Sequence, residues 1–517
     1  MSMMTTENFD SLRKDGSLSS DRPDIPSVLK DAMELVSRIG ERYLWVDALC
    51  IQQDSPEKHK DLARMDVIYS HALFTLIAVN GTDANVPLPG LRPRSRLPLK
   101  PVVHIADHVL ISGPPCLDEV LKSSKYETRG WTLQERVLSR RCLYISEQGM
   151  YFQCNTSTWS ETTGFKGHRR EHNQLSKFNS IRLRGSVLAQ TLGVGSSTRA
   201  TLQIWSQALL IYYKLVELYS SRSLSYPDDV LNAFAGFSSV FAESCGGGFV
   251  AGLPTAVLAA SLLWVSKSPF SRRPSCRGTL FPSWSWIGWE GPVTYLYSPP
   301  SNHDEGSTSE TRSEMQNLEI LLDDPSNASI RLNDFEDEEA LLAVGIVQVF
   351  SLGKAHNVTV RARSAEPASE DLPPVDILRF HAWIVETQAF NIFQNRGISH
   401  PSSINPMLSV CCCGSKKRCG ALFGVQQSDS ARIGLGDCRF KLVAISRQKT
   451  SWKKQNDYPV LQALGISAYG EDWDFMNVML IKRGENGKYF ERAGMGVIRY
   501  KTYEKEVISY WASILLG

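Results

Sequence analysis

The stretch Tyr43–Asp54 constrains the fold of this chain most strongly. It opens with the apolar run Tyr43–Val46, which follows Gly40 and is rich in aromatic and branched side chains. Such a run is typical of a strand that is buried on both faces of a parallel sheet. Asp47 ends the run. Because ligands bind beyond the carboxyl ends of strands in open α/β sheets, we expect Asp47 to lie at a binding crevice.

Helical and strand patterns alternate around this stretch. Apolar residues recur every three or four positions over 28–39, and Gly40 is expected to end that helix. A second helix is predicted over 55–72, with an apolar face formed by Leu62, Met65, Ile68, Tyr69 and Ala72. The run Phe74–Val79 predicts another buried strand. The order helix, strand, helix, strand favours a parallel sheet that is covered by helices.

A second informative segment, Arg129–Glu135, reads Arg-Gly-Trp-Thr-Leu-Gln-Glu. It is followed by a strand-like run, Cys142–Ile145, and preceded by a β-like run, Val102–Ser112. This segment and Leu44–Asp54 resemble two motifs of the fungal heterokaryon-incompatibility (HET) domain, which are written Arg-Gly-Trp-Thr-x-Gln-Glu and Leu-Trp-Ile-Asp-x-Leu-Cys-Ile-x-Gln-Asp. The resemblance implies an α/β fold with a TIR-like, flavodoxin-like parallel sheet and flanking helices. It also implies a role in non-self recognition and in the programmed cell death that follows fusion of unlike fungal cells.

HET domains usually begin with a strand that ends in Ser-Tyr-x-Trp-Gly, and this sequence has no such motif. We therefore expect an incomplete sheet that lacks its first strand and part of any pocket built on it. A sheet without that strand exposes backbone donors, which is costly. The missing motif favours a signalling or interaction module, with protein partners or self-association through the HET domain, over an enzyme.

Five regions are predicted along the chain. They are a disordered N-terminus over 1–22, the truncated HET domain over 23–165, a helical and Trp-rich region over 166–297, a linker over 298–318 and a β-rich C-terminal module over 319–517. The tryptophans of the third region are expected to be core aromatics, because large aromatic side chains mainly bury area. They are Trp284, Trp286 and Trp289.

Composition excludes several classes of protein. With 517 residues, 42% of them hydrophobic and 21% charged, the chain is expected to fold into several soluble globular domains. A net charge of +2 gives no reason to expect a nucleic-acid or membrane partner. Eleven irregularly spaced cysteines and the lack of a secretory signal favour a cytoplasmic location. The uncharged stretch Gly248–Val265 contains Pro254, which favours a buried helix over Thr255–Val265 rather than a membrane span.

Glu135 is the leading candidate for chemistry. Enzymatic TIR domains cleave NAD at the nicotinamide–ribose bond with a glutamate four residues after a tryptophan, and the resemblance implies this role for Trp131 and Glu135. Residues four apart share one face of a helix, so the ring and the carboxylate would contact one ligand. A fixed carboxylate would stabilise the positive charge that develops on the ribose. NAD would then be a substrate, and no cofactor or metal would be needed.

Structural roles account for the same residues. Thr132–Glu135 fits a capping box, in which Glu135 only stabilises the first helical turn by about 1 kcal/mol. Asp47 either binds ribose hydroxyls or caps the turn that follows it. Arg129 either binds a phosphate or pairs with an acid such as Asp47 or Glu135.

No metal site is predicted. Cys411–Cys413 and Cys419 lie close in sequence, but they do not form a Cys-x-x-Cys pair with a second pair of ligands nearby. The sequence also lacks a Walker lysine and a Gly-x-Ser-x-Gly segment, which weakens the P-loop and α/β-hydrolase interpretations. Two hypotheses remain, a HET signalling module and an NAD-cleaving enzyme that uses Glu135.

Overall fold

The computed structural model divides the chain into two compact units. Unit 1 comprises Met1–Leu183 and Asn232–Ser239, and unit 2 comprises Arg184–Leu231 and Val240–Gly517. The structure describes residues 3–19, 21–62, 64–92, 95–96, 102–105, 108–111, 115–155, 157–161, 198–245, 248–268, 270–274, 280–296, 308–322, 359–362, 375–394, 407–413, 418–451, 472–506 and 509–517.

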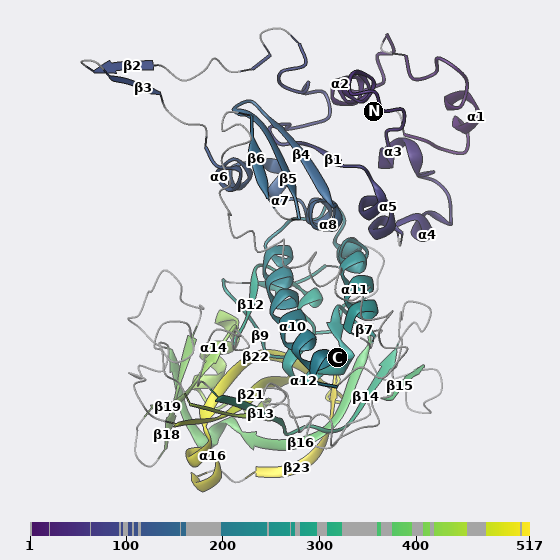
Figure 1. The fold of residues 1–517 in the computed structure, drawn as a ribbon. Helices are drawn as coiled ribbons and strands as arrows, with labels where there is room; N and C mark the ends of the chain where they lie inside the picture. The colour runs from purple at the N-terminus through teal and green to yellow at the C-terminus, as the bar shows by residue number, and fades with distance from the viewer. Residues whose placement is uncertain are drawn as a thin grey trace. The chain divides into compact units, whose positions relative to one another are not determined.

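Unit 1 begins with helices (Figure 1). They are α1 (Phe9–Leu12), α2 (Ser27–Arg38), α3 (Asp47–Cys50), α4 (Lys58–Leu62) and α5 (Met65–His71). The helix predicted over 28–39 is confirmed as α2. Gly40 has a φ of +82° and the N–H of Glu41 donates to the carbonyl of Val36 at 3.0 Å, which closes α2 as a Schellman motif. The helix predicted over 55–72 forms two pieces, α4 and α5.

The N-terminal segment, which the sequence predicts to be disordered, is hydrogen-bonded to the loop after α3. The N–H of Met4 donates to the carbonyl of Ala48 at 2.8 Å, and the N–H of Gln53 donates to the carbonyl of Met4 at 2.8 Å. The N–H of Thr6 donates to the Asp54 carboxylate at 2.9 Å. These bonds hold residues 3–6 along the Tyr43–Asp54 stretch. All three use a backbone N–H of the chain as donor, which a polar composition does not reveal.

The strand predicted over Tyr43–Val46 is not formed, and that prediction is wrong. Tyr43 is 88% exposed, and residues 41–46 have no regular secondary structure. Val46 is extended, with φ −138° and ψ 121°, and leads directly into α3. Leu44, like the sheet residues Leu76 and Ala78, packs against the buried cluster of Ala32, Leu88 and Ile145. The run is therefore apolar because it packs beside the sheet, without pairing in it, and Asp47 begins a helix where a strand end was expected.

The sheet of unit 1 has the strand order β1-β4-β5-β6. Its strands are β1 (Thr75–Ala78), β4 (Arg141–Ser146), β5 (Gly149–Cys154) and β6 (Thr158–Ser160). β1 and β4 are parallel, with Thr75 opposite Cys142, and the other two pairings are antiparallel. The two predicted strands over 74–79 and 142–145 are thus confirmed. Among the described strands of the unit 1 sheet, the predicted parallel arrangement is confirmed only for the β1–β4 pair.

The connection from β1 to β4 carries the remaining elements of unit 1 (Figure 1). A hairpin confirms the β-like run predicted over 102–112, and three helices follow it. These elements are β2 (Val102–Ile105), β3 (His108–Ile111), α6 (Leu117–Lys122), α7 (Lys125–Thr128) and α8 (Gly130–Leu138). The core between helices and sheet includes Ile77, Leu121, Tyr126 and Tyr144. α8 is thereby fixed directly before β4.

Two helices and a Trp-rich region begin the downstream part of the chain. The helices are α10 (Thr198–Ser220) and α11 (Asn232–Cys245), and the first part of α11 belongs to unit 1. Trp284, Trp286 and Trp289 are at most 5% exposed, so their prediction as core aromatics is confirmed. The indole N–H of Trp286 donates to the hydroxyl of Tyr212 at 3.2 Å. These residues form the core of unit 2 beside α10.

Short elements surround the tryptophans. They are η2 (Pro227–Val230), β7 (Phe249–Val250), β8 (Leu253–Pro254), η3 (Thr255–Val257), α12 (Leu258–Ser261), β9 (Trp264–Ser266), β10 (Ser271–Arg272), η4 (Trp286–Gly288), β11 (Trp289–Glu290) and β12 (Val293–Tyr295). The buried helix predicted over Thr255–Val265 is wrong in length, because α12 ends at Ser261 and a strand follows. Within the described ranges, no helix combines the length with the hydrophobicity that crossing a bilayer requires.

The C-terminal region is β-rich, as predicted, and forms one eleven-stranded sheet (Figure 1). Its elements are β13 (Thr308–Ser313), β14 (Gln316–Leu322), β15 (Thr359–Ala362), β16 (Ile377–Glu386), η9 (Thr387–Ala389), β17 (Phe390–Gln394), β18 (Met407–Cys412), β19 (Arg418–Phe423), α14 (Gln427–Gly434), β20 (Phe440–Ser451), β21 (Asp472–Arg483), β22 (Phe490–Arg499), α16 (Tyr500–Glu506) and β23 (Ser509–Leu516). Part of the segment predicted as a linker over 298–318 forms β13 and the start of β14. Residues 341–352, part of the β-rich module predicted over 319–517, lie outside the described residues.

Five strands of this sheet close into a ring. β16 pairs with β20, β20 with β21, β21 with β22, and β23 pairs both with β16 and, at Phe490 and Leu516, with β22. A closed ring leaves no free edge among its members. Fully buried side chains of the ring strands include Phe380, Phe440, Val478 and Ile514.

Candidate ligand-binding site around Glu135

Helix α8 carries two of the four predicted site residues. Leu133, Val137 and Leu138 are at most 1% exposed and anchor one side of the helix in the core. Trp131 and Glu135 are half-buried on the same helix, four residues apart, so they share a face as the sequence predicts. The carboxylate of Glu135 is thus held on a rigid, well-anchored element.

The capping-box interpretation of Glu135 is wrong. α8 begins at Gly130, with Arg129 as its N-cap, so Thr132 lies inside the first turn. The hydroxyl of Thr132 donates to the carbonyls of Tyr126, at 2.6 Å, and Arg129, at 2.8 Å. It cannot act as the N-cap acceptor that a capping box requires. Glu135 therefore lies in the second turn of α8, outside the reach of the helix start.

Tyr69 on α5 brings the predicted residues together. Burial raises the pKa of Tyr69 well above its ordinary value of 10.0, and the negative charges of Glu135 and Asp47 raise it further, while Arg129 lowers it. Because charge–charge effects fall off with distance and screening, all three groups lie near this one phenol. The charges of Asp47, Arg129 and Glu135 thus all act on the pKa of the Tyr69 phenol.

Packing contacts agree with this arrangement. α5 packs against α8, and the ring of Trp45 lies edge-on to the ring of Tyr69 at 5.9 Å and 76°. Asp47 follows Trp45 by two residues and opens α3. Its carboxylate accepts a hydrogen bond from the N–H of Ala48 at 2.7 Å, which is the local role that the sequence offers as an alternative to ligand binding.

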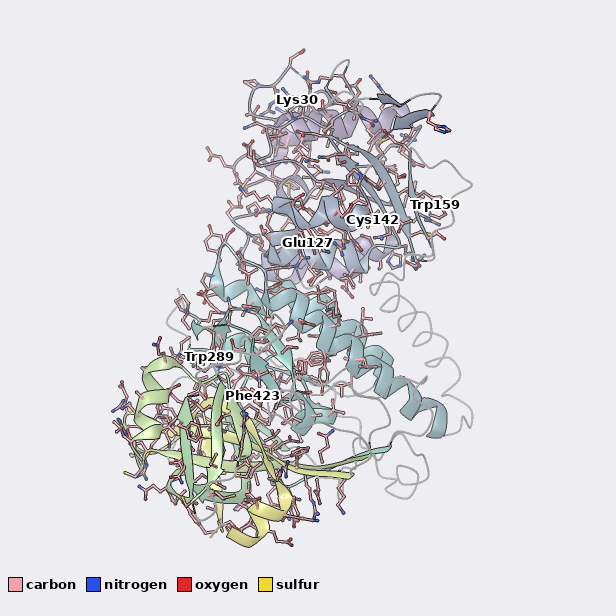
Figure 2. All side chains as sticks on the ribbon, turned by 90° about the vertical axis from the view of Figure 1, so that its left-hand side faces the viewer. Lys30, Glu127, Cys142, Trp159, Trp289 and Phe423 are labelled. Atoms are coloured by element: carbon pink, nitrogen blue, oxygen red, sulfur yellow. The ribbon has the colours of Figure 1, made fainter. Side chains whose placement is uncertain are left out.

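The charge of Glu135 also influences the pKa values of two buried groups, Tyr126 and Cys142. Burial raises the pKa of Tyr126 well above 10.0, and Glu135 adds to this effect. Burial likewise raises the pKa of the Cys142 thiol to about 11, with a smaller contribution from Glu135. Glu127, which is labelled in Figure 2, accepts a hydrogen bond from Arg136 at 2.6 Å, and Arg136 is itself largely buried. This ion pair ties α8 to α7, which precedes it.

The outer side of the site is open to solvent. Asp47 and Arg129 are exposed, whereas Trp131 and Glu135 are half-buried. Two carboxylates, one guanidinium and one indole suit a ligand that carries hydroxyl groups, an anionic group and a flat ring. In the part of the chain that the structure describes, no group of three or more His, Cys, Asp or Glu side chains is arranged to hold a metal ion.

A cavity elsewhere in the molecule is too small for such a ligand. It lies in unit 2 and has a volume of about 10 Å³, which is roughly the space that one water molecule needs. Two of its lining residues, Trp289 and Phe423, are labelled in Figure 2. Its other lining residues include Trp264, Phe270 and Arg492.

Comparison with known families places the site within a recognised segment. Residues 3–135 match the family model described as Heterokaryon incompatibility protein (HET). The match agrees with the resemblance of the two sequence motifs and covers about a quarter of the chain. All four predicted residues, Asp47, Arg129, Trp131 and Glu135, fall within this HET segment. No curated protein and no solved structure matches the chain.

Sequence analysis missed two residues of the site environment. Tyr69 was assigned to the apolar face of a helix, which its 9% exposure supports, but the charges of Asp47, Arg129 and Glu135 all influence the pKa of its phenol. Arg136 follows Glu135 directly and pairs with Glu127, which lies nine positions earlier. A tyrosine is the one polar residue on the predicted apolar face of α5, and this was the signal available in the sequence.

Proposed function

We propose that this protein acts in fungal non-self recognition, as a cytoplasmic signalling module whose HET segment engages protein partners or self-associates to trigger programmed cell death. The observation that carries the proposal is the family match over residues 3–135. The incomplete, TIR-like sheet that the sequence implies belongs to this proposal. Its support is the parallel β1–β4 pair, which is connected through helices α6, α7 and α8.

Inducible expression in a filamentous fungus tests the signalling role. Expression of the full chain should reduce the viability of the cells. Leu133→Asp should abolish the effect, because it places a charge at a side chain of the HET segment that is 0% exposed. Leu18→Asp, at a leucine that is 37% exposed, is the matched control and should remain toxic. Unchanged viability while the wild-type protein accumulates would contradict the proposal.

A second candidate function is cleavage of NAD. It is favoured by the resemblance of Arg129–Glu135 to the HET motif and by the position of Trp131 and Glu135 on one face of α8, while the charges of Asp47, Arg129 and Glu135 all act on the pKa of Tyr69. In this role Glu135 would stabilise positive charge on the ribose, and Arg129 would bind a phosphate. Asp47 would accept hydrogen bonds from ribose hydroxyls, and Trp131 would pack on a ring of the ligand. An enzymatic module can also be a signalling module, so the two functions are compatible.

Release of nicotinamide and ADP-ribose from NAD by the purified chain tests this candidate. Glu135→Gln keeps the shape of the side chain and removes its charge, so turnover should fall at least ~100-fold while the melting temperature is retained. Glu34→Gln, at an exposed glutamate on α2, should leave turnover unchanged. Full activity of Glu135→Gln would exclude a catalytic role for this carboxylate.

A further inference from the structure

Two tryptophans lie side by side on the exposed face of β16 and β23, which are neighbours in the sheet of unit 2 (Figure 1). Side chains alternate between the two faces of a strand, and Phe380, Ala382 and Ile384 of β16 are buried. Trp383 therefore points to the opposite, exposed face. It lies directly across from Trp511 of β23, and the two rings are 5.3 Å apart at 69°. Each of these two side chains is 39% exposed.

The indole N–H groups distinguish this pair from the tryptophans of the core. The buried tryptophans each donate their N–H to a protein oxygen at 2.9 to 3.2 Å, and they are Trp264, Trp284, Trp286 and Trp289. Within the part of the chain that the structure describes, neither Trp383 nor Trp511 donates its N–H to the protein. Two donors and two open ring surfaces are thus available to a ligand on one face of the sheet.

A row of polar side chains crosses three strands beside the tryptophan pair. His381 of β16 lies opposite Ser513 of β23 on one side and opposite Gln316 of β14 on the other, and opposite residues share a face. Ser513 and Gln316 are exposed. The ring of His381 is nearly parallel to that of Trp511, at 21° and 6.5 Å, and its Nδ1 is shielded from water without a hydrogen-bond partner among the described residues. A ligand that engages this imidazole would remove the cost of the unpaired nitrogen.

Charge at this face favours a neutral ligand. β16 carries one arginine and one glutamate, and both are paired. Arg379 donates to Glu319 at 2.9 Å, and Lys441 donates to Glu386 at 2.8 Å. β23 contains no acidic or basic residue. Because the charges that flank the tryptophan pair cancel, the face offers little attraction to a phosphate chain or to a cation.

Saccharides are neutral ligands whose chemistry matches these groups. The C–H groups of a sugar ring carry a partial positive charge and pack on the negative face of an indole. Sugar hydroxyls both accept and donate, so they can pair with the indole N–H groups and with the acceptors of His381 and Ser513. A proline-rich peptide also packs on aromatic rings, but its backbone carbonyls only accept, which would leave those acceptors unpaired.

We propose that the aromatic face, formed by Trp383, Trp511, His381, Ser513 and Gln316, binds a neutral oligosaccharide. A sugar ring packs on the indoles, and its hydroxyls exchange hydrogen bonds with the indole N–H groups and with the polar row. The site lies outside residues 3–135, so it goes beyond the function proposed for the HET segment and does not depend on NAD cleavage. It gives the C-terminal module a ligand of its own.

Calorimetry of the full chain with neutral hexasaccharides tests this proposal. The probes are cellohexaose, laminarihexaose, chitohexaose and mannohexaose, and at least one should bind with a Kd of about 1 mM or lower. Trp383→Ala and Trp511→Ala should each weaken that binding at least ~10-fold, because each removes one of the two ring surfaces. Phe393→Ala, at an exposed aromatic side chain of β17 in the same sheet, is the matched control and should bind as the wild type does.

Trp511→Phe separates binding from folding. It keeps a ring opposite Trp383 and removes the indole N–H, so the affinity should fall about 3- to 10-fold while the melting temperature is retained. Wild-type affinity in both alanine variants would overturn the assignment of the site. If the wild-type chain binds none of the four sugars at about 1 mM, or binds decaproline through the same two tryptophans in their place, the saccharide class is overturned.

Discussion

Arg492 is a buried cation held by neutral groups. It is 3% exposed, donates to the carbonyl of Leu262 at 2.7 Å and to that of Trp264, and lies 3.7 Å above the ring of Trp264. Burial lowers the pKa of its guanidinium to about 9, and Tyr295 opposes the shift. The planar fork links strand β22 to the Trp-rich region by two hydrogen bonds and a cation–π contact at once.

We expect Arg492→Lys to lower the free energy of unfolding by about 2 kcal/mol. An ammonium group keeps the charge but cannot reach both carbonyls while it stacks on Trp264, so one buried acceptor loses its partner. Arg38→Lys, at an exposed ion pair on α2, should cost less than about 0.5 kcal/mol. Urea unfolding of the variants measures both values. Identical midpoints for Arg492→Lys and wild type would show that the paired hydrogen bonds of Arg492 do not stabilise the fold.

At the scale of elements, the contact of α8 with α11 inside unit 1 depends on a glycine. A Cβ atom at Gly236 would lie 2.7 Å from Leu138 Cδ1 and 2.8 Å from Gln134 Nε2. Both side chains are at most 1% exposed, so neither can move into solvent. The close approach of the two helices therefore excludes even a methyl group.

Gly236→Ala should destabilise the protein, although replacing glycine by alanine usually stabilises a helix. In an exposed helix alanine is favoured over glycine by about 1 kcal/mol, but here overpacking should produce a net loss of about 1–2 kcal/mol. Ser238→Ala, two residues further along α11, is the control and should be close to neutral. Thermal unfolding distinguishes the outcomes, and a rise in melting temperature for Gly236→Ala would show that α8 has room to shift.

The sequence correctly predicted those helices and strands whose formation depends on interactions between nearby residues. The period of α2 and the stop at Gly40 were readable, as were β1 and β4, because each depends on neighbouring residues in the sequence. Tyr43–Val46 was mispredicted, since an apolar run indicates burial but a strand also needs a partner edge. The capping box failed because the start of α8 is set by contacts of Thr132 with Tyr126 and Arg129, of which only the second is local to the helix start.

The candidate site was predicted in part for the same reason. The motifs identified Asp47, Arg129 and Glu135 one at a time. Their common neighbour, Tyr69, was visible only as one member of an apolar helical face. Its role near the charged groups depends on the packing of α5 against α8, which no single segment of the sequence encodes.

For the whole molecule, the buried tyrosines determine how stability responds to alkaline pH. Burial raises the pKa values of Tyr212, Tyr213, Tyr219 and Tyr295 in unit 2 above 10.0. Above pH ~10 the unfolded chain releases phenol protons that the native state retains, so stability falls as the pH rises. Arg492 acts in the opposite direction above pH ~9, because its native pKa is depressed, but it is one group against four.

Unit 2 should therefore lose stability between pH 10 and 12. We expect the urea midpoint to be constant from pH 7 to 9 and then to fall, with tyrosinate absorbance near 295 nm appearing only as the protein unfolds. Cys142 in unit 1 shifts the onset for that unit lower, since its thiol has a native pKa of about 11 against 9.0 when unfolded. Tyrosinate absorbance that rises before unfolding would show that the four phenols are accessible in the native state.

The ring of five strands has a consequence for how this protein is made. β16 leaves the ribosome long before β23, which pairs with it through eight residues from Ser509 to Leu516. Until β23 has been translated, one side of β16 in this ring has an unfilled backbone ladder. We expect nascent chains to depend on chaperones, and we expect a premature stop codon between β16 and β23 to leave an aggregation-prone product in place of a shortened but working protein.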